Sequence, residues 1–436
     1  MIPLRVSIAL LCVAAAAPLA AAAVDVPDGF AVTSVSIAPA GALAGALDRL
    51  PNGRLALFDG VELAEIDPLT GSKVLTLHTP PSAVYASFVR TDPTGTYALF
   101  GETSNHEIWR VPLAGGPATL VATLPYSYAC WFRAPGRAVI AHGDASFQST
   151  RIVELDVDTG ATDVLADVPG PSGPVAFDDE GNLYYGTNDP SFPAPPHQQT
   201  VLRFSADAVL SALGPTHLTD TQATVFAAGF TAISSFAFDG EGDLLVGDSI
   251  DGVVTEIGPN GTSKGALAVE SHGSFPSVGP LAFVPGTAPG AQFAPYQPEE
   301  AGTLYALSTD FLTFNDLNRI TPRRAVASAS PPGPIAAGPF SFGIDHGPDG
   351  GFGLLFVALS PLPAELPVPH AGTTFAIGFD PATLLGSAPI LLDTGGALSI
   401  AANHPGGPAT LVVQAALFDP GLGAVGTTTP LVLTFR

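Results

Sequence analysis

The sequence predicts an all-β protein: a six-bladed β-propeller followed by a small β-sandwich domain. The main observation is a phrase that recurs six times: an apolar run, a tight turn ending in glycine, a second apolar run and a polar loop. The turn glycines are spaced 42, 41, 45, 61 and 60 residues apart, and they are Gly53, Gly95, Gly136, Gly181, Gly242 and Gly302. A period of about 40–45 residues made of short strands is typical of four-stranded propeller blades.

Composition supports the same fold class. The 436 residues include 48 glycines and 44 prolines, while 46% of the chain is hydrophobic. Frequent turn residues between strong apolar runs favour a turn-rich β fold over disorder.

The first three blades follow the repeat in order. Each Pro/Asp/Gly cluster between two apolar runs supplies the fixed or positive φ that a hairpin needs. The predicted strands are 45–50, 54–58, 63–66 and 73–77 in blade 1, 86–89, 97–100, 107–111 and 119–124 in blade 2, and 129–132, 151–155 and 163–166 in blade 3.

Blades 4 to 6 repeat the plan with insertions in the two longest intervals. Ser205 is an N-cap residue ahead of apolar residues at helical spacing, which predicts a helix of two turns after the third strand of blade 4. The predicted strands are 174–177, 182–185 and 201–204 in blade 4, 236–238 and 244–246 in blade 5, and 281–283 and 303–307 in blade 6.

An alternating segment, residues 30–37, precedes blade 1. We expect it to complete the last blade and so close the ring, because closure removes exposed strand edges. A free N-terminal arm is the alternative.

The repeat stops after Arg324. Residues 325–338 are rich in Ala, Ser, Pro and Gly and indicate a linker. The strands predicted beyond it are 353–359, 373–379, 397–401, 410–418 and 430–435. Alternating strands without helix signals predict a β-sandwich over 336–436, with the propeller over 24–330.

Two resemblances accompany these patterns. Through the phrases at 175–184 and 236–245, the propeller resembles the broad class of six-bladed NHL and SMP-30/gluconolactonase-like folds. Through 353–360, 391–396 and 413–420, the C-terminal segment resembles a small module that closes many secreted bacterial proteins. The second resemblance implies an accessory or packing role and carries no catalytic residue.

The N-terminus predicts export. A basic start, an apolar stretch and an Ala-rich cleavage signal make residues 1–23 a signal peptide, leaving a secreted or periplasmic protein. A membrane anchor is the alternative, but the stretch is shorter than the roughly 20 apolar residues of a spanning helix. Cys130 is then the only cysteine, so no intramolecular disulfide can form.

The formal charge of −24 limits the classes of binding partner that we expect. With 39 acidic and 15 basic residues, the surface repels phosphate backbones and anionic lipids, so we expect neither as a partner. No segment after residue 23 is long and apolar enough to cross a membrane, so we expect no membrane span. Divalent cations, basic proteins and neutral sugars are compatible partners. We expect a monomer that binds an extracellular ligand or protein.

Polar residues gather in the loops after the second strand of each blade. In a propeller these loops surround one mouth of the channel, so they predict a ligand-binding rim made by Glu102, His142, Asp144, Asn188, Asp189 and Asp248. Asn188 and Asp248 are the predicted metal ligands, since Ca²⁺ takes six to eight oxygen ligands from such groups. The plainer alternative is a set of solvated surface acids.

The chain lacks a recognisable set of nucleophile, base and orienting group at this mouth, so the sequence favours a secreted binding or scaffold module over an enzyme. The alternative is a Ca²⁺-dependent, lactonase-like hydrolase at the channel mouth, in which one carboxylate activates water.

Overall fold

The computed structural model describes residues 24–38, 42, 44–82, 84–191, 194–213, 216–271, 277–310, 314–370, 373–404, 406–421 and 423–436. The predicted signal peptide, residues 1–23, lies outside the described residues. In the part of the chain that is described, no helix is both long and apolar enough to cross a membrane.

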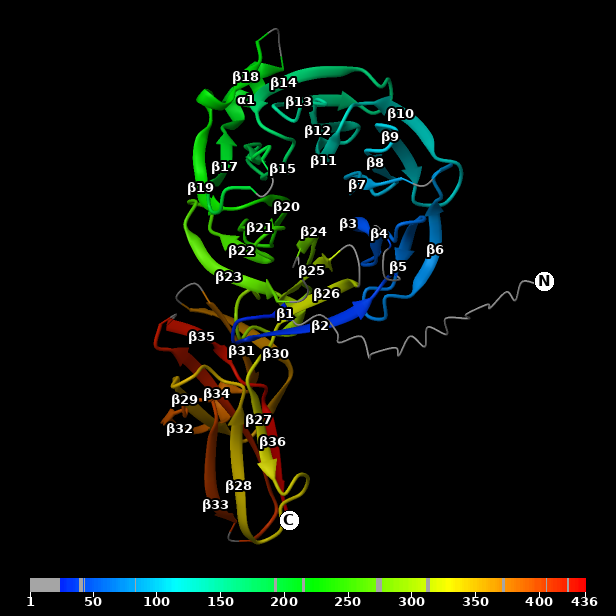
Figure 1. The fold of residues 1–436 in the computed structure, drawn as a ribbon. Coiled ribbons are helices and arrows are strands. Elements are labelled where there is room, and N and C mark those ends of the chain that lie inside the picture. The colour runs from blue at the N-terminus through cyan, green and yellow to red at the C-terminus, as the bar shows by residue number, and fades with distance from the viewer. Residues whose placement is uncertain are drawn as a thin grey trace, which may run out of the picture.

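Six antiparallel sheets surround a central channel, which confirms the predicted six-bladed propeller (Figure 1). The first three are β3 (Gly45–Arg49), β4 (Leu55–Phe58), β5 (Leu63–Ile66) and β6 (Lys73–His78); β7 (Ala86–Thr91), β8 (Tyr97–Glu102), β9 (Glu107–Pro112) and β10 (Thr119–Thr123); and β11 (Ser127–Ala134), β12 (Arg137–Gly143), β13 (Ser149–Asp156) and β14 (Thr162–Pro169).

The other three sheets continue the ring in chain order. They are β15 (Val175–Phe177), β16 (Leu183–Gly186), β17 (Gln199–Phe204) and β19 (Thr224–Phe230); β20 (Ile233–Phe238), β21 (Leu244–Asp248), β22 (Val253–Ile257) and β23 (Ser263–Glu270); and β24 (Ser277–Pro285), β25 (Gly302–Thr309), β26 (Asn315–Pro322) and β2 (Phe30–Ser36).

The ring closes through its N-terminal segment, as predicted. Strand β2 pairs antiparallel with β26 and becomes the outer strand of blade 6. The short strand β1 (Val24–Asp25) pairs with β23 and extends blade 5. Two residues show no periodicity, so the sequence did not reveal β1.

The Asp-x-x-Gly phrases of blades 4 and 5 form the same turn. Asp178 Oδ1 accepts the backbone N–H groups of Glu180 and Asn182, at 3.0 and 2.8 Å. Asp239 makes the equivalent bonds in blade 5. The glycine that follows has a φ of 85° in both blades, a conformation that glycine adopts at little steric cost.

Adjacent blades are held together by apolar packing. One cluster joins blades 3 and 4, with Val139 and Ile152 contributed by the first and Tyr185 and Phe204 by the second. All four side chains are fully buried. Truncation of an aromatic side chain such as Phe204 to alanine typically costs about 3–5 kcal/mol.

The insertion of blade 4 contains the predicted helix, α1 (Ala206–Ala212). Ser205 is its N-cap and accepts the backbone N–H of Ala208 at 3.3 Å. The chain then forms β18 (Leu218–Thr219), which pairs parallel with β14, and the one-turn 3₁₀ helix η1 (Asp220–Gln222). This insertion therefore reaches back from blade 4 to the outer edge of blade 3.

After blade 6 the chain forms three further sheets. They are β27 (Val326–Ser330), β28 (Gly338–Asp345) and β33 (Leu398–His404); β29 (Phe352–Ala358), β32 (Leu384–Leu391), β34 (Ala409–Asp419), β35 (Gly423–Thr427) and β36 (Leu431–Phe435); and β30 (Pro361–His370) with β31 (Thr373–Phe379). The first two share a hydrophobic cluster that includes Ile344, Ala415 and Leu417. The narrower description as a β-sandwich stays a prediction.

The predicted linker is wrong over part of its length. Residues 326–330 form β27, which pairs with β28. Its Ala- and Ser-rich sequence has little strand propensity, so pairing with a neighbouring strand decides its conformation. The predicted strand at 373–379 matches β31, and the other four C-terminal predictions overlap β29, β33, β34 and β36.

The C-terminal sheets contact the propeller through blade 6. Tyr296, in the loop between β24 and β25, is buried in the C-terminal hydrophobic cluster. Arg324 Nη1 lies 2.6 Å from Glu365 Oε2, and its Nη2 donates to the carbonyl of Thr428 at 2.6 Å. These contacts join the two parts directly after the last propeller strand.

Candidate functional site

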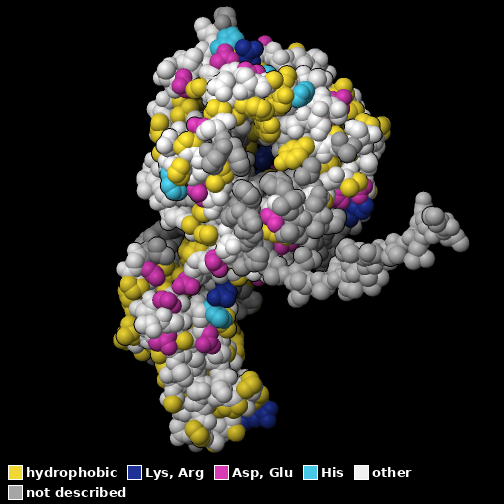
Figure 2. Space-filling view, viewed as in Figure 1, with side chains coloured by type: hydrophobic (Ala, Val, Ile, Leu, Met, Phe, Trp, Pro, Cys, Tyr) yellow, Lys and Arg dark blue, Asp and Glu magenta, His cyan; other side chains and the backbone are white. Residues whose placement is uncertain are grey.

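A pocket lies where the inner strands of all six blades begin. Its volume is about 330 Å³, close to the lower end of the range of about 300–1,000 Å³ that is usual for small-molecule sites. Figure 2 shows a hollow in the middle of the ring, and the described atoms at its border are largely yellow and white. Lining residues come from every blade, including Gly45, Ser87, Tyr128, Pro174, Ser234 and Ser277.

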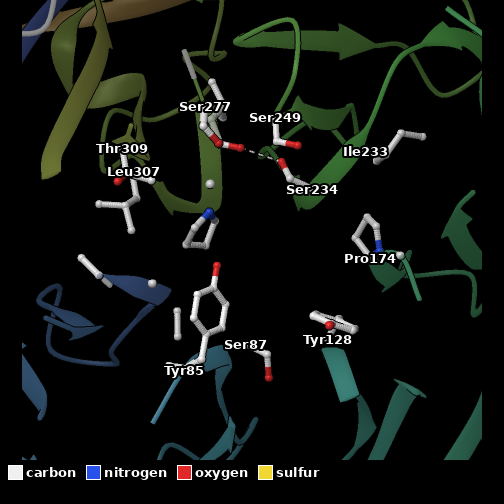
Figure 3. A pocket seen from close by; sticks show the side chains of 18 of the residues that line it. Tyr85, Ser87, Tyr128, Pro174, Ile233, Ser234, Ser249, Ser277, Leu307 and Thr309 are labelled. Carbon is white, nitrogen blue, oxygen red and sulfur yellow. Dashed lines mark hydrogen bonds between the residues drawn. The ribbon is translucent and has the colours of Figure 1, made fainter. Parts of the chain in front are cut away.

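The described lining of this pocket is uncharged but rich in hydroxyl groups. Its polar side chains are Tyr85, Ser87, Tyr128, Ser172, Ser234, Ser249, Ser277 and Thr309. Figure 3 shows the Tyr85 hydroxyl pointing toward the middle of the pocket. Such a surface can donate and accept hydrogen bonds without offering a charge.

Both tyrosines keep their protons at neutral pH. Burial raises the pKa of Tyr85 above its ordinary value. Burial also raises the pKa of Tyr128, with a smaller contribution from the nearby Tyr85. Each phenol is therefore available as a neutral hydrogen-bond donor and as an apolar ring face.

Hydrogen bonds hold the pocket wall between blades 5 and 6. Ser234 Oγ donates to the carbonyl of Val278 at 2.7 Å, the bond drawn in Figure 3. The neighbouring Ser235 Oγ donates to the carbonyl of Gly279 at 2.7 Å. Ser172 differs, because its buried Oγ has no hydrogen-bond partner among the described residues.

The channel narrows beneath the pocket. The Arg90 guanidinium lies over the Trp131 ring, 3.5 Å from its centroid, and Arg90 Nη1 is 3.4 Å from Asp48 Oδ1. A small space of about 60 Å³ borders Arg90 and Trp131, and the same two side chains also line a larger cleft at the opposite mouth. The stacked pair thus separates the pocket from the opposite mouth.

The two predicted metal ligands act on one backbone segment, residues 231–233. Asn188 exchanges two hydrogen bonds with the backbone of Ile233. Asp248 accepts the backbone N–H groups of Thr231 and Ala232, and also those of Ile250 and Asp251. Burial raises the pKa of Asp248 despite these bonds. The acceptor oxygens of both side chains already have backbone donors, and their role as metal ligands stays a prediction.

Glu102 has a similar place in blade 2. Its carboxylate is fully buried and accepts the backbone N–H groups of Asn105 and Glu107. These bonds hold the loop between β8 and β9.

The other predicted rim residues lie apart from this pocket lining. Asp144 is exposed and Asp189 is partly exposed, and each accepts bonds from a serine of its own loop, Ser146 and Ser191 respectively. His142 is partly buried on β12, and burial lowers its pKa. None of the six predicted residues is among those that line the pocket, and their roles in ligand binding stay predictions.

Sequence reasoning missed the hydroxyl-bearing residues that form the pocket. Four of them, Ser87, Tyr128, Ser234 and Ser277, stand at the first or second position of an inner strand, where serine and tyrosine read as ordinary strand residues. The available signal was positional: Ser87, Tyr128 and Ser234 precede the apolar core of β7, β11 and β20 at equivalent places.

The opposite mouth is acidic. A cleft of about 700 Å³ is lined by more acidic than basic side chains: its turn carboxylates include Asp178, Asp179 and Glu241, and its basic residues are Arg49, Arg90 and Arg203. Beside it, carboxylate oxygens of Asp239, Asp243 and Glu256 lie within 4.8 Å of one another and could hold a metal ion.

Fold and pocket together define the class: a six-bladed β-propeller with a ligand-sized pocket at one channel mouth. No protein-family model matches the sequence, and no curated protein matches it.

Several solved structures are similar. The calcium-binding protein regucalcin from Agrobacterium tumefaciens is 16% identical, with a TM-score of 0.47 over 68% of this chain and 96% of that one. A gluconolactonase from Xanthomonas campestris is 14% identical, with a TM-score of 0.48 over 69% and 96%. An auxiliary nutrient binding protein from Bacteroides thetaiotaomicron is 10% identical, with a TM-score of 0.45 over 67% and 77%.

Proposed function

We propose that this chain is an exported binding module whose propeller holds a small neutral polar molecule, such as a sugar or another polyol, in the six-blade pocket. The observation that carries this proposal is the chemistry of the described pocket lining, which combines hydroxyl groups and two tyrosines with no charged side chain. A charged ligand would leave bulk water without gaining a partner of opposite charge, whereas a polyol exchanges hydrogen bonds with water for equivalent bonds with the protein.

Two further features support a polyol. The rings of Tyr85 and Tyr128 provide apolar faces beside polar groups, an arrangement suited to the mixed surface of a sugar ring. The buried Ser172 hydroxyl, without a partner among the described residues, is a polar group that a ligand or a bridging water could satisfy after a small adjustment.

The lactonase-like alternative finds less support. That chemistry needs a carboxylate-held cation beside the reacting group. The described pocket lining contains no carboxylate, and the carboxylate oxygens of Glu102 and Asp248 accept hydrogen bonds from backbone N–H groups. The geometry therefore favours binding without turnover.

The proposal is tested by titrating the purified mature chain with a panel of neutral mono- and disaccharides. Binding of each sugar is measured by calorimetry or by ligand-observed NMR. At least one sugar should bind, and Tyr85→Ala should weaken its binding by up to about tenfold, since an aromatic contact is worth about 0.5–1.5 kcal/mol beyond the area that it buries. Leu120→Ala is the control, because Leu120 is exposed on the outer strand of the same blade.

Two results would overturn the proposal. One is binding that is equally strong in the wild type and in Tyr85→Ala. The other is hydrolysis of a lactone that depends on added Ca²⁺ and stops with chelator, which would establish the enzymatic alternative.

A further inference from the structure

Blade 5 carries a group of carboxylates at the end of its sheet that lies away from the six-blade pocket. Asp239 follows β20, Asp243 precedes β21, and Glu256 lies on β22. One carboxylate oxygen from each lies within 4.8 Å of the other two, and we call this group the blade-5 carboxylate cluster. The pocket is at the start of β20, so the whole strand separates the two places.

Asp239 brings an incompletely satisfied oxygen to the cluster. Its side chain is fixed, because Oδ1 accepts the backbone N–H groups of Glu241 and Asp243, both at 2.9 Å. Asp239 is only 8% exposed. Its Oδ2 is shielded from solvent and has no hydrogen-bond partner among the described residues. A buried carboxylate oxygen without a partner is costly, and a cation is the most effective partner for it.

Lys264 neutralises the rest of the cluster only in part. Its ammonium contacts Asp243 and lies 2.9 Å from Glu256 Oε1, and no described contact joins it to Asp239. The lysine side chain is 48% exposed, whereas those of Asp243 and Glu256 are 3% and 12% exposed. The lysine can therefore turn its charged end into water, while the carboxylates stay buried.

We propose that Asp239, Asp243 and Glu256 bind a hard divalent cation, with Ca²⁺ as the representative ion, and that the Lys264 ammonium moves into solvent when the ion enters. Carboxylate oxygens are the preferred ligands of such ions. Each of the three carboxylates offers one oxygen to the ion, and the cleft beside Asp239 leaves room for water ligands.

The bound ion links three places in the blade. Asp239 and Asp243 hold the turn between β20 and β21, and Glu256 belongs to the next strand outward. The ion thus joins the inner hairpin to β22, and its binding free energy adds to the stability of the blade. This role is independent of the ligand proposed for the six-blade pocket.

The experiment uses the mature full chain treated with chelator and then titrated with CaCl₂, with binding followed by calorimetry and unfolding by thermal melts at constant ionic strength. We expect one ion per chain and a rise in Tm that saturates. Lys264→Met keeps the apolar stem but removes the competing charge, so it should bind Ca²⁺ about tenfold more tightly. Its Tm should be lower than that of the wild type in chelator and should rise more with Ca²⁺.

Asp239→Asn should bind about tenfold more weakly than the wild type, since it removes one charged ligand. Asp144→Asn is the matched control, because Asp144 is an exposed acid in a loop of another blade, and it should bind like the wild type. If Asp239→Asn does not fold, the comparison of Ca²⁺ affinity between Lys264→Met and the wild type tests the proposal by itself.

The proposal is overturned if neither the wild type nor Lys264→Met shows saturable Ca²⁺ binding, or if a folded Asp239→Asn binds as tightly as the wild type. Sugar binding by the six-blade pocket is measured on the same samples. Its presence or absence tests the proposed function separately, because Tyr85→Ala should leave Ca²⁺ binding unchanged.

Discussion

Asn188 and Ile233 are joined by a pair of hydrogen bonds that spans two blades. Asn188 Nδ2 donates to the carbonyl of Ile233, and the Ile233 N–H donates to Asn188 Oδ1, both at 3.0 Å. The amide side chain forms one donor and one acceptor hydrogen bond with the backbone of Ile233, as a neighbouring β-strand would. It thereby connects the segment after β16 in blade 4 to the first residue of β20 in blade 5. A residue predicted as a metal ligand thus has a structural role in this geometry.

Asn188→Ala should lower the free energy of unfolding by about 2–3 kcal/mol, because both polar groups of Ile233 lose their partners. Urea unfolding of the ligand-free protein measures this loss. Asp189→Ala is the control, since Asp189 is partly exposed and its described side-chain bonds are to Ser191 of its own loop, and its effect should stay within about 0.5 kcal/mol. An Asn188→Ala protein as stable as the wild type would show that the pair adds little.

Asp248→Ala should be at least as damaging. The buried carboxylate accepts the backbone N–H of Thr231, in the segment before β20, and that of Asp251, in the loop after β21. Its removal leaves several donors unsatisfied and should cost about 3 kcal/mol in the absence of any ligand. Equilibrium unfolding tests this, with Asp144→Ala as the exposed counterpart. A normal stability combined with lost ligand or metal binding would restore the role predicted from sequence.

The fold could be predicted because its signals are local. Gly181 and Gly242 adopt the positive φ that their turns require, and an aspartate three residues before each bonds to the turn backbone. The turn glycine recurs once per blade, so its spacing established the number of blades and their order. Strand β32 was missed, because its glycine and proline oppose strand propensity and only pairing with β29 defines it.

The site was harder to predict for a physical reason. The loop acids Glu102 and Asp248 resemble ligands in sequence, but in the fold Glu102 accepts backbone N–H groups of its own loop and Asp248 accepts those of its own loop and of residues 231–232. Whether a carboxylate bonds to backbone or faces a cavity depends on tertiary geometry. The pocket residues Ser87 and Ser234 come from strands about 150 residues apart, and only the closed ring brings them together.

Arg324→Ala should loosen the C-terminal sheets while leaving the propeller intact. The guanidinium pairs with Glu365 and donates to the carbonyls of Thr427 and Thr428, so its loss removes charge-assisted bonds at the junction. Hydrogen exchange at Thr427 and Thr428 should become about tenfold faster, which corresponds to a loss of about 1.4 kcal/mol in local stability. Arg323→Ala is the control, because the adjacent Arg323 is exposed. Unchanged exchange in Arg324→Ala would contradict this role.

His78→Phe should make the protein less sensitive to acid. The His78 ring packs on Trp109 and Phe100, with centroid distances of 5.4 and 5.9 Å, and its buried Nε2 has no partner among the described residues. Burial lowers the pKa of His78, so the folded protein favours the neutral ring. The unfolded chain takes up a proton below about pH 6.5, and stability is therefore lost as the pH falls from there toward the lower pKa of the folded state.

Phenylalanine at position 78 keeps the aromatic packing and has no proton to bind. The difference in unfolding free energy between pH 7.5 and pH 5.0 should therefore be smaller in His78→Phe than in the wild type. His217→Phe, at an exposed position, should leave that difference unchanged. An equal difference in His78→Phe and the wild type would show that His78 does not contribute to the acid sensitivity.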